Sequence, residues 1–139
     1  ELASRAVVDG ILLQGVEFDV VGGPTLGADA LTIGIAGIQR CRWFFVRKEP
    51  KGRGTNKLIE GSPIGDGDRC LIVEDAITTG GSLLKAVDAV EVTGAKVVAV
   101  STLVDRGEIA RPLIEKRGIL YYPIATYLDL GIEPVELPS

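Results

Sequence analysis

One stretch of the chain joins an apolar run, an acidic pair and a segment rich in hydroxyl groups and glycine. Residues 71–73 are Leu-Ile-Val, Glu74 and Asp75 follow, and residues 78–82 read Thr-Thr-Gly-Gly-Ser before a helical pattern begins. In an open parallel sheet, ligands bind beyond the carboxyl ends of the strands, which is where this pattern places both carboxylates. Carboxylates there suit sugar hydroxyls or a metal ion, while hydroxyls and free N–H groups at a helix N-terminus attract a phosphate monoester. A helix cap would explain only one acidic or hydroxyl residue, so the whole run predicts a cradle for a sugar phosphate.

This run resembles, almost position for position, the phosphoribosyl-pyrophosphate (PRPP) motif of the type I phosphoribosyltransferases. The resemblance implies that Glu74 and Asp75 hold two ribose hydroxyls and that residues 78–82 hold the 5-phosphate. The residues of this run that we expect to bind PRPP are Glu74, Asp75, Ala76, Ile77, Thr78, Thr79, Gly80, Gly81 and Ser82.

A second glycine-rich segment, residues 20–27, lies between a predicted strand and a predicted helix. Alone, it could equally be an ordinary strand-to-helix turn. Placed before the acidic run, it resembles the family's pyrophosphate loop, which implies that backbone amides around Gly22, Gly23, Pro24 and Thr25 face the leaving group. Some orotate phosphoribosyltransferases carry a lysine in this loop, and the matching position here is Leu26. A lysine contact with pyrophosphate from this loop is therefore not expected.

The longest predicted loop runs from Arg47 through Ile64 and packs five cations into residues 47–57. Such a run is most often a solvated face, but beside a phosphate cradle it could close over a polyanion and neutralise charge on a departing pyrophosphate. It resembles the catalytic loop of orotate phosphoribosyltransferase, with Arg53 where that family has histidine. Arginine keeps the charge but does not transfer protons near neutral pH. The resemblance implies Lys51, Arg53 and Asp75 as catalytic residues, and Arg47, Lys48, Lys51 and Arg53 as further PRPP contacts.

A fourth segment, residues 103–108, ends a predicted strand and begins a predicted helix. By itself it is typical of a helix N-cap followed by an acidic first turn. Aligned with the orotate enzymes, Arg106 matches the arginine that binds the orotate ring and its carboxylate, and Thr78 matches a second orotate contact. A planar guanidinium suits an anionic heterocycle of this kind.

The elements that must position these segments alternate along the chain, which predicts an α/β fold with a mainly parallel sheet flanked by helices. This is also the fold that the type I phosphoribosyltransferase resemblance implies. The expected strands are residues 18–21, 43–46, 71–73, 97–104 and 119–122. The expected helices are residues 2–13, 28–36, 82–92 and 108–116.

The composition of the chain excludes several classes of catalytic and binding site. The chain has 139 residues and a net charge of −4, so we expect one domain and no broad basic surface for nucleic acid. It has no histidine, which excludes Ser-His and Cys-His nucleophilic machinery and histidine zinc sites. Its two cysteines are too few for a disulfide scaffold, and no apolar stretch reaches the roughly 18 residues of a membrane helix. A cytoplasmic protein that binds neither membrane nor nucleic acid is the expectation.

Together, these features predict a single phosphoribosyltransferase domain, residues 1–139, that transfers ribose 5-phosphate from PRPP to orotate. By resemblance, Mg²⁺ is required and is carried mainly by PRPP, with no metal site of the protein's own, and the enzyme is a homodimer that shares the cationic loop between subunits. The family's N-terminal hood segment has no match in residues 1–14. Three alternatives stay open: transfer to another base such as a purine, a regulatory module that senses PRPP, and a binding domain with decayed catalysis.

Overall fold

The computed structural model describes residues 1–50 and 58–136 of the chain. Their strands form one sheet in the order β3-β2-β1-β4-β5-β6, in which all neighbours are parallel except the β2–β3 pair. The strands are β1 (Val20–Pro24), β2 (Arg42–Val46), β3 (Ile59–Gly61), β4 (Arg69–Ile77), β5 (Lys96–Asp105) and β6 (Leu120–Thr126). The α/β fold with a mainly parallel sheet is thereby confirmed.

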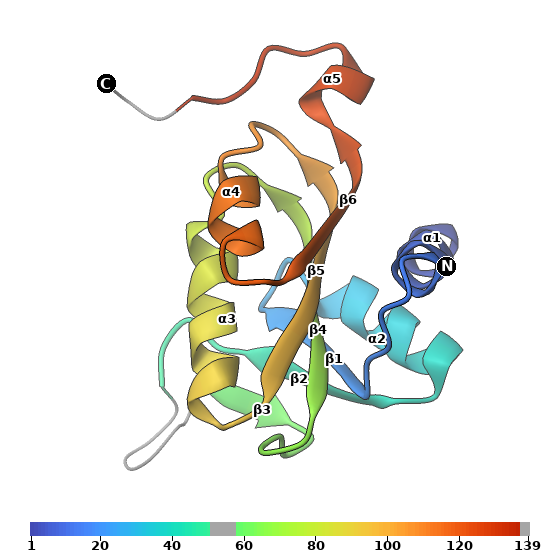
Figure 1. Cartoon of the computed structure of the whole chain (residues 1–139), viewed down its shortest axis with the longest axis vertical. Coiled ribbons are helices and arrows are strands. Elements are labelled where there is room, and N and C mark those ends of the chain that lie inside the picture. Colours follow the sequence, from blue (N-terminus) through green and yellow to red (C-terminus); the bar gives the residue numbers. More distant parts are fainter. Residues whose placement is uncertain (51–57, 137–139) are drawn as a thin grey trace.

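Helices cover both faces of the sheet (Figure 1). They are α1 (Leu2–Leu13), α2 (Asp29–Gln39), α3 (Gly81–Val92), α4 (Ala110–Glu115) and α5 (Tyr127–Leu130). The first two lie on one face and α3 and α4 lie on the other, while α5 follows β6 at its carboxyl end. None of the described helices has the length and apolarity needed to cross a bilayer.

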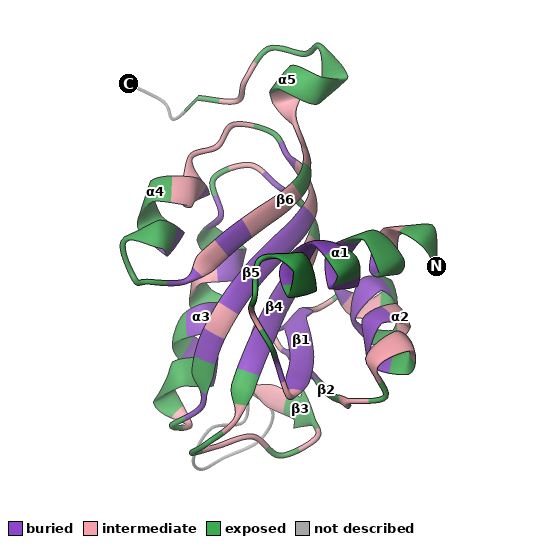
Figure 2. Cartoon of the chain, turned by 45° about the vertical axis from the view of Figure 1, so that its right-hand side comes forward, coloured by how far each residue is buried: buried purple, intermediate pink, exposed green. Residues whose placement is uncertain are grey.

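Each face of the sheet has its own apolar cluster because central parallel strands are buried on both sides. Beneath α1 and α2, side chains such as Val7 and Ile35 pack on Val21 and Leu71. Beneath α3 and α4, the cluster includes Leu83 and Val87 with Ile72 and Val100 of the sheet. Figure 2 shows the result, with buried residues running through β1, β4 and β5 between the two helical layers.

Several expected boundaries need correction. Strand β4 continues through Ile77, four residues past its expected end, because β5 pairs with it as far as Ile77 and Asp105. The segment expected to be a single loop up to Ile64 contains β3, which pairs with the edge of β2. The expected helix at 108–116 begins only at Ala110.

Candidate functional site

The site lies where the strand order reverses. Strand β1 has β2 on one side and β4 on the other, so the chain leaves β1 and β4 in opposite directions. Pairing between β1 and β4 stops at Gly22 and Ile72, while β4 runs on to Ile77. Crevices at such switch points are the usual ligand sites of open α/β sheets.

The acidic pair borders this crevice from within β4 rather than from a loop after it. Glu74 is paired in register with Thr102 of β5, and the buried Thr102 hydroxyl donates a hydrogen bond of 3.3 Å to the Asp75 carbonyl. Pairing on the β5 side holds the backbone, so the two carboxylates are presented by a rigid strand. The expectation that both residues follow the strand end is wrong: they lie within β4, in the part that extends beyond its pairing with β1.

The segment after β1 closes on the acidic pair at a glycine. A Cβ on Gly27 would lie 2.8 Å from both Asp75 Oδ1 and Glu74 Oε1. Only a residue without a side chain lets the backbone approach the two carboxylates this closely. Gly27 was absent from the residues expected at the site, because no sequence pattern shows which side chain a distant glycine will face.

Burial changes the chemistry of Glu74. Desolvation and the neighbouring Asp75 charge raise the pKa of Glu74 to about 7, with Lys48 acting in the opposite direction. Lys48 is exposed and follows the carboxyl end of β2. Because its charge acts on Glu74, β2 contributes to the crevice together with β1 and β4. A carboxyl group held near its pKa at neutral pH accepts hydroxyl donors or a cation readily, since either relieves the repulsion from Asp75.

The residues of the predicted phosphate cradle lie at the start of α3. Gly80 adopts a left-handed conformation with φ of 82°, and a Cβ there would lie 2.5 Å from the Ala110 Cβ of α4. Residues 74 and 76–83 line a cavity of about 170 Å³ at this turn. The first-turn amides of a helix have no acceptors within the helix, so this cavity offers donors to an anion. Residues 78–82 are thereby brought together beside Glu74.

The predicted pyrophosphate loop is placed differently from expectation. Gly22, Gly23 and Pro24 form the last part of β1 and are buried, rather than lying in an exposed loop. Both glycines are required by packing: a Cβ on Gly22 would lie 2.4 Å from the Phe44 ring, and one on Gly23 would lie 2.1 Å from the Val73 carbonyl oxygen. Even Thr25 donates its N–H to the Val46 carbonyl, at 3.0 Å. The exposed part of the segment is therefore Leu26 and Gly27.

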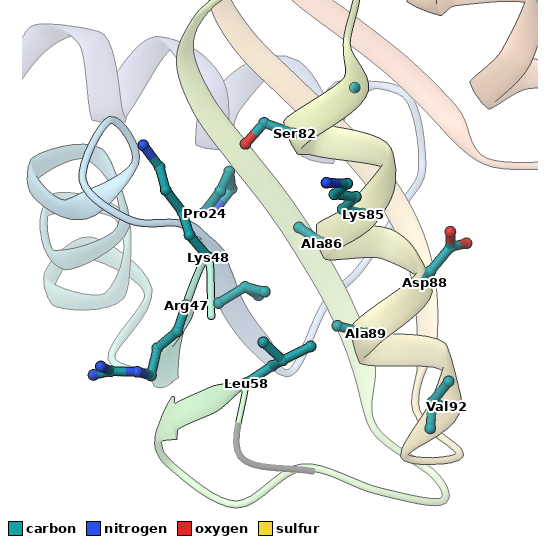
Figure 3. A pocket seen from close by; sticks show the side chains of 12 residues that line it. Pro24, Arg47, Lys48, Leu58, Ser82, Lys85, Ala86, Asp88, Ala89 and Val92 are labelled. Atoms are coloured by element: carbon teal, nitrogen blue, oxygen red, sulfur yellow. The ribbon is translucent and has the colours of Figure 1, made fainter. Parts of the chain in front are cut away.

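The two described cations of the basic segment diverge. The Arg47 guanidinium pairs with Glu60 of β3 at 3.0 Å, and its side chain points away from that of Lys48 (Figure 3). Both line a larger cavity of about 680 Å³ between β2 and α3, which meets the phosphate cradle at Gly81 and Ser82. Lys51 and Arg53 lie outside the described residues. The charge of Lys48 thus acts on the acidic pair, whereas Arg47 is paired with Glu60 on the edge strand β3.

The loop after β5 lies beside the loop after β4. Arg106 donates its backbone N–H to the carbonyl of Ile77, at 2.9 Å, which places it next to Thr78. The Arg106 side chain is exposed, and Asp105 before it is fully buried. The two residues expected to contact orotate therefore sit on adjacent loops at the same sheet edge.

Comparison with known proteins agrees with this geometry. The family model of the phosphoribosyl transferase domain matches residues 10–118, which is most of the chain. The chain belongs to the phosphoribosyltransferase family. Its matched segment includes β1, β4 and the loops after them, which form the crevice.

Curated relatives of the chain include proteins named orotate phosphoribosyltransferase. That of Pyrococcus abyssi is 44% identical over 116 residues, covering 84% of this chain and 63% of the relative. That of Mycobacterium leprae is 46% identical over 123 residues, covering 87% of this chain and 68% of the relative. The chain thus spans about two thirds of the length of these enzymes, and slightly less in the first case.

Solved structures of the family share the fold. Orotate phosphoribosyltransferase of Mycobacterium tuberculosis in complex with PRPP superposes with a TM-score of 0.76 at 39% identity, covering 94% of this chain and 75% of that one. Adenine phosphoribosyltransferase of Thermoanaerobacter pseudethanolicus, at 18% identity, gives a TM-score of 0.72 and shows the shared fold alone. These neighbours confirm the expected type I phosphoribosyltransferase fold.

Proposed function

We propose that this chain transfers ribose 5-phosphate from PRPP to orotate, giving orotidine 5-phosphate and pyrophosphate. The observation that carries the proposal is the meeting of Glu74, Asp75, the residue 78–82 cradle and the Arg106 loop at one edge of the sheet. The relatives named orotate phosphoribosyltransferase, and the PRPP complex among the structural neighbours, support the same reaction.

The geometry suits catalysis by positioning and electrostatics. The 5-phosphate would accept hydrogen bonds from the first turn of α3, and the ribose hydroxyls would donate to Glu74 and Asp75. With the sugar held at both ends, the anomeric carbon lies between the acidic pair and the base near Arg106. Cleavage of the bond to pyrophosphate leaves oxocarbenium character on the ribose and negative charge on the leaving group, and we expect Lys48, whose charge acts on Glu74, to stabilise that negative charge.

The strongest cationic assistance is expected from residues that the structure does not describe. Lys51 and Arg53 stay predictions from the sequence, with Lys51 expected to stabilise or protonate the leaving pyrophosphate. Arg47 also stays a predicted PRPP contact. To bind PRPP, its guanidinium would have to break the ion pair with Glu60.

The acidic pair fits a magnesium ion that arrives with PRPP. Within residues 1–50 and 58–136, no three His, Cys, Asp or Glu side chains are grouped to hold a metal. Two adjacent carboxylates, one with a raised pKa, are hard oxygen donors that could complete a shell built mostly from substrate oxygens. Magnesium would supply charge neutralisation on the pyrophosphate.

Three further expectations belong to the same proposal. Residues 1–139 form one phosphoribosyltransferase domain, which the single continuous sheet supports. The active form is a homodimer that shares the cationic segment, and sedimentation velocity tests this by the mass of the species in solution. A cytoplasmic location completes the set.

The test of function is the fall in orotate absorbance on mixing the protein with PRPP, Mg²⁺ and orotate, with adenine and hypoxanthine in parallel. Loss of the orotate signal with release of pyrophosphate is the expected result. If the protein instead turned over adenine or hypoxanthine, the acceptor would be a purine and not orotate. Tight PRPP binding with no turnover of any base would favour a PRPP-sensing module and overturn the proposed reaction.

A further inference from the structure

A buried carboxylate anchors the loop that carries Arg106. Asp105 ends β5 with no exposed surface. Its Oδ1 accepts hydrogen bonds from the backbone N–H groups of Gly107, at 3.0 Å, and Glu108, at 2.7 Å. The pattern of residues 103–108 is typical of a helix N-cap, but α4 begins five residues after Asp105, so the carboxylate instead organises the loop between strand and helix.

The other oxygen of this carboxylate has a partner on the next strand. The Tyr121 hydroxyl of β6 donates a hydrogen bond to Asp105 Oδ2. Tyr121 is itself buried, and the Arg111 guanidinium of α4 lies 5.0 Å from the centre of its ring. Burial and the contact with Asp105 raise the pKa of Tyr121, so the hydroxyl stays a donor throughout the neutral range.

The loop needs such anchoring because its backbone is strained and crowded. Glu108 has a φ of 53°, a region that residues other than glycine rarely adopt. A Cβ on Gly107 would lie 2.4 Å from the carbonyl oxygen of Val135, whose own N–H donates to the Arg106 carbonyl at 2.8 Å. Arg106 is therefore tied by its N–H to β4, by its carbonyl to the C-terminal segment, and through its next two residues to Asp105.

We propose that Asp105 and Tyr121 are positioning residues, which fix the backbone around Arg106 so that its guanidinium is oriented toward the base. This inference rests on the proposed function, because it takes orotate as the ligand of Arg106. Recognition of a planar anion by a guanidinium depends on orientation, and an error of about 1 Å is costly. Neither Asp105 nor Tyr121 needs to touch substrate for this role.

The test separates base recognition from PRPP binding. Tyr121→Phe keeps the ring beside Arg111 and removes the one hydroxyl donor, whereas Asp105→Ala removes both acceptors of the pair. Asp105→Asn is the conservative variant, since its amide oxygen can still accept from the loop while its NH₂ faces the Tyr121 oxygen. We expect the KM for orotate, at saturating PRPP, to rise about 10-fold or more in Asp105→Ala, several-fold in Tyr121→Phe and least in Asp105→Asn.

The Kd of PRPP, measured by calorimetry without orotate, is expected to stay within about 2-fold in all three variants. Tyr122→Phe is the matched control, because it removes a hydroxyl from the adjacent position of β6 while leaving the Asp105 contact in place. Unchanged orotate KM in Tyr121→Phe and Asp105→Ala, in an enzyme whose wild type turns over orotate, would overturn the positioning role alone. An increase in the Kd of PRPP equal to the increase in the KM for orotate would also overturn the positioning role. Asp105 and Tyr121 would then only support the fold. Failure of the wild type to use orotate would instead overturn the proposed function, and this inference with it.

Discussion

The two ends of the sheet carry similar charges and arrange them in opposite ways. At the amino ends of the strands, acidic and basic side chains pair with each other. Arg69 contacts Asp19 at 2.8 Å and Glu17 at 3.5 Å, and Arg42 pairs with Asp68. At the carboxyl ends, Arg47 pairs with Glu60 of the edge strand, but Lys48, Glu74 and Arg106 form no ion pair with any other residue of the described chain.

The ion-paired side chains at the amino ends stabilise the fold, whereas the side chains without ion pairs at the carboxyl ends are available to bind a ligand. Paired surface charges have most of their electrostatic energy satisfied within the protein, so a ligand gains little from them. At the carboxyl ends, Glu74 is pushed against Asp75 and its pKa is raised, a condition that a bound hydroxyl or cation would relieve. The comparison predicts that substitutions at the two ends have opposite effects on ligand binding and on stability.

The largest effect is expected from removing both carboxylates at the carboxyl end. Glu74→Gln with Asp75→Asn should weaken the Kd of PRPP by more than about 100-fold, because charged acceptors contribute about 1.5–3 kcal/mol per hydrogen bond. The same variant should be no less stable to urea than wild type, since like-charge repulsion is removed. Calorimetry with PRPP and Mg²⁺ measures the binding.

A matched control removes two negative charges at the amino end. Glu17→Gln with Asp66→Asn should leave the PRPP Kd within about 2-fold of wild type. An equal loss of affinity in this variant would show that net charge, rather than the acidic pair, governs binding.

A smaller effect is expected from crowding the acidic pair. Gly27→Ala places a methyl group near both carboxylates, which are flexible enough to move aside, so folding should survive. Their displacement should weaken PRPP binding by about 10-fold. Gly37→Ala in α2 is the control, because a Cβ there would meet no described atom within 4 Å apart from its chain neighbours and the backbone of its own helix, and it should leave affinity unchanged. If both alanine variants bind PRPP like wild type, the close approach at Gly27 has no role in the site.

The raised pKa of Glu74 gives a pH-dependent test in the absence of ligand. Between its usual value of 4.5 and about 7, the folded protein keeps a proton that the unfolded chain releases. The free energy of unfolding should therefore fall as the pH rises through this range, by about 1 kcal/mol once solvent screening is considered. Urea unfolding at pH 5 and pH 8 measures the change, and Glu74→Gln should remove it. Identical pH profiles for the two proteins would contradict the assignment.

The smallest effect belongs to the amino end. Hydrogen bonds from the Arg69 side chain and backbone lower the pKa of Asp19 to about 2, so this contribution to stability is present above about pH 4 and is lost as the pH falls toward 2. Asp19→Asn should lower the urea midpoint at neutral pH by a few tenths molar and leave the PRPP Kd unchanged. Asp9→Asn, on an exposed turn of α1, serves as the control. A loss of PRPP affinity in Asp19→Asn would break the separation between the two ends.

The sequence predicted most of the fold because buried parallel strands read as short apolar runs. Helix α1 matches its expected bounds, and β2 begins one residue before the expected start. Strand β3 was missed because its three residues are held by pairing with β2 rather than by any pattern of their own. The four residues of α5 are likewise too few to show a helical period.

The site residues also fall into those that a local sequence pattern can predict and those that only the fold brings together. Glu74, Asp75 and the residue 78–82 cradle are contiguous in sequence, so a motif could reveal them before the fold was known. Gly27, Asp105 and Tyr121 act through contacts across 16 to 48 residues of chain, which only the folded structure brings together. The buried Gly22 and Gly23 were mistaken for loop residues because glycine marks turns and close packing alike.

The most direct test of the account is an NMR titration of the ¹⁵N-labelled protein with PRPP and Mg²⁺, followed by orotate. The account predicts that PRPP shifts the amide signals of residues 26–27 and 74–83, and that orotate then shifts those of residues 106–108. Signals at the amino end, around residues 17–19, 42 and 66–69, should stay in place. Shifts concentrated at the amino end, or none at the carboxyl end, would contradict the assignment of the switch point as the PRPP site.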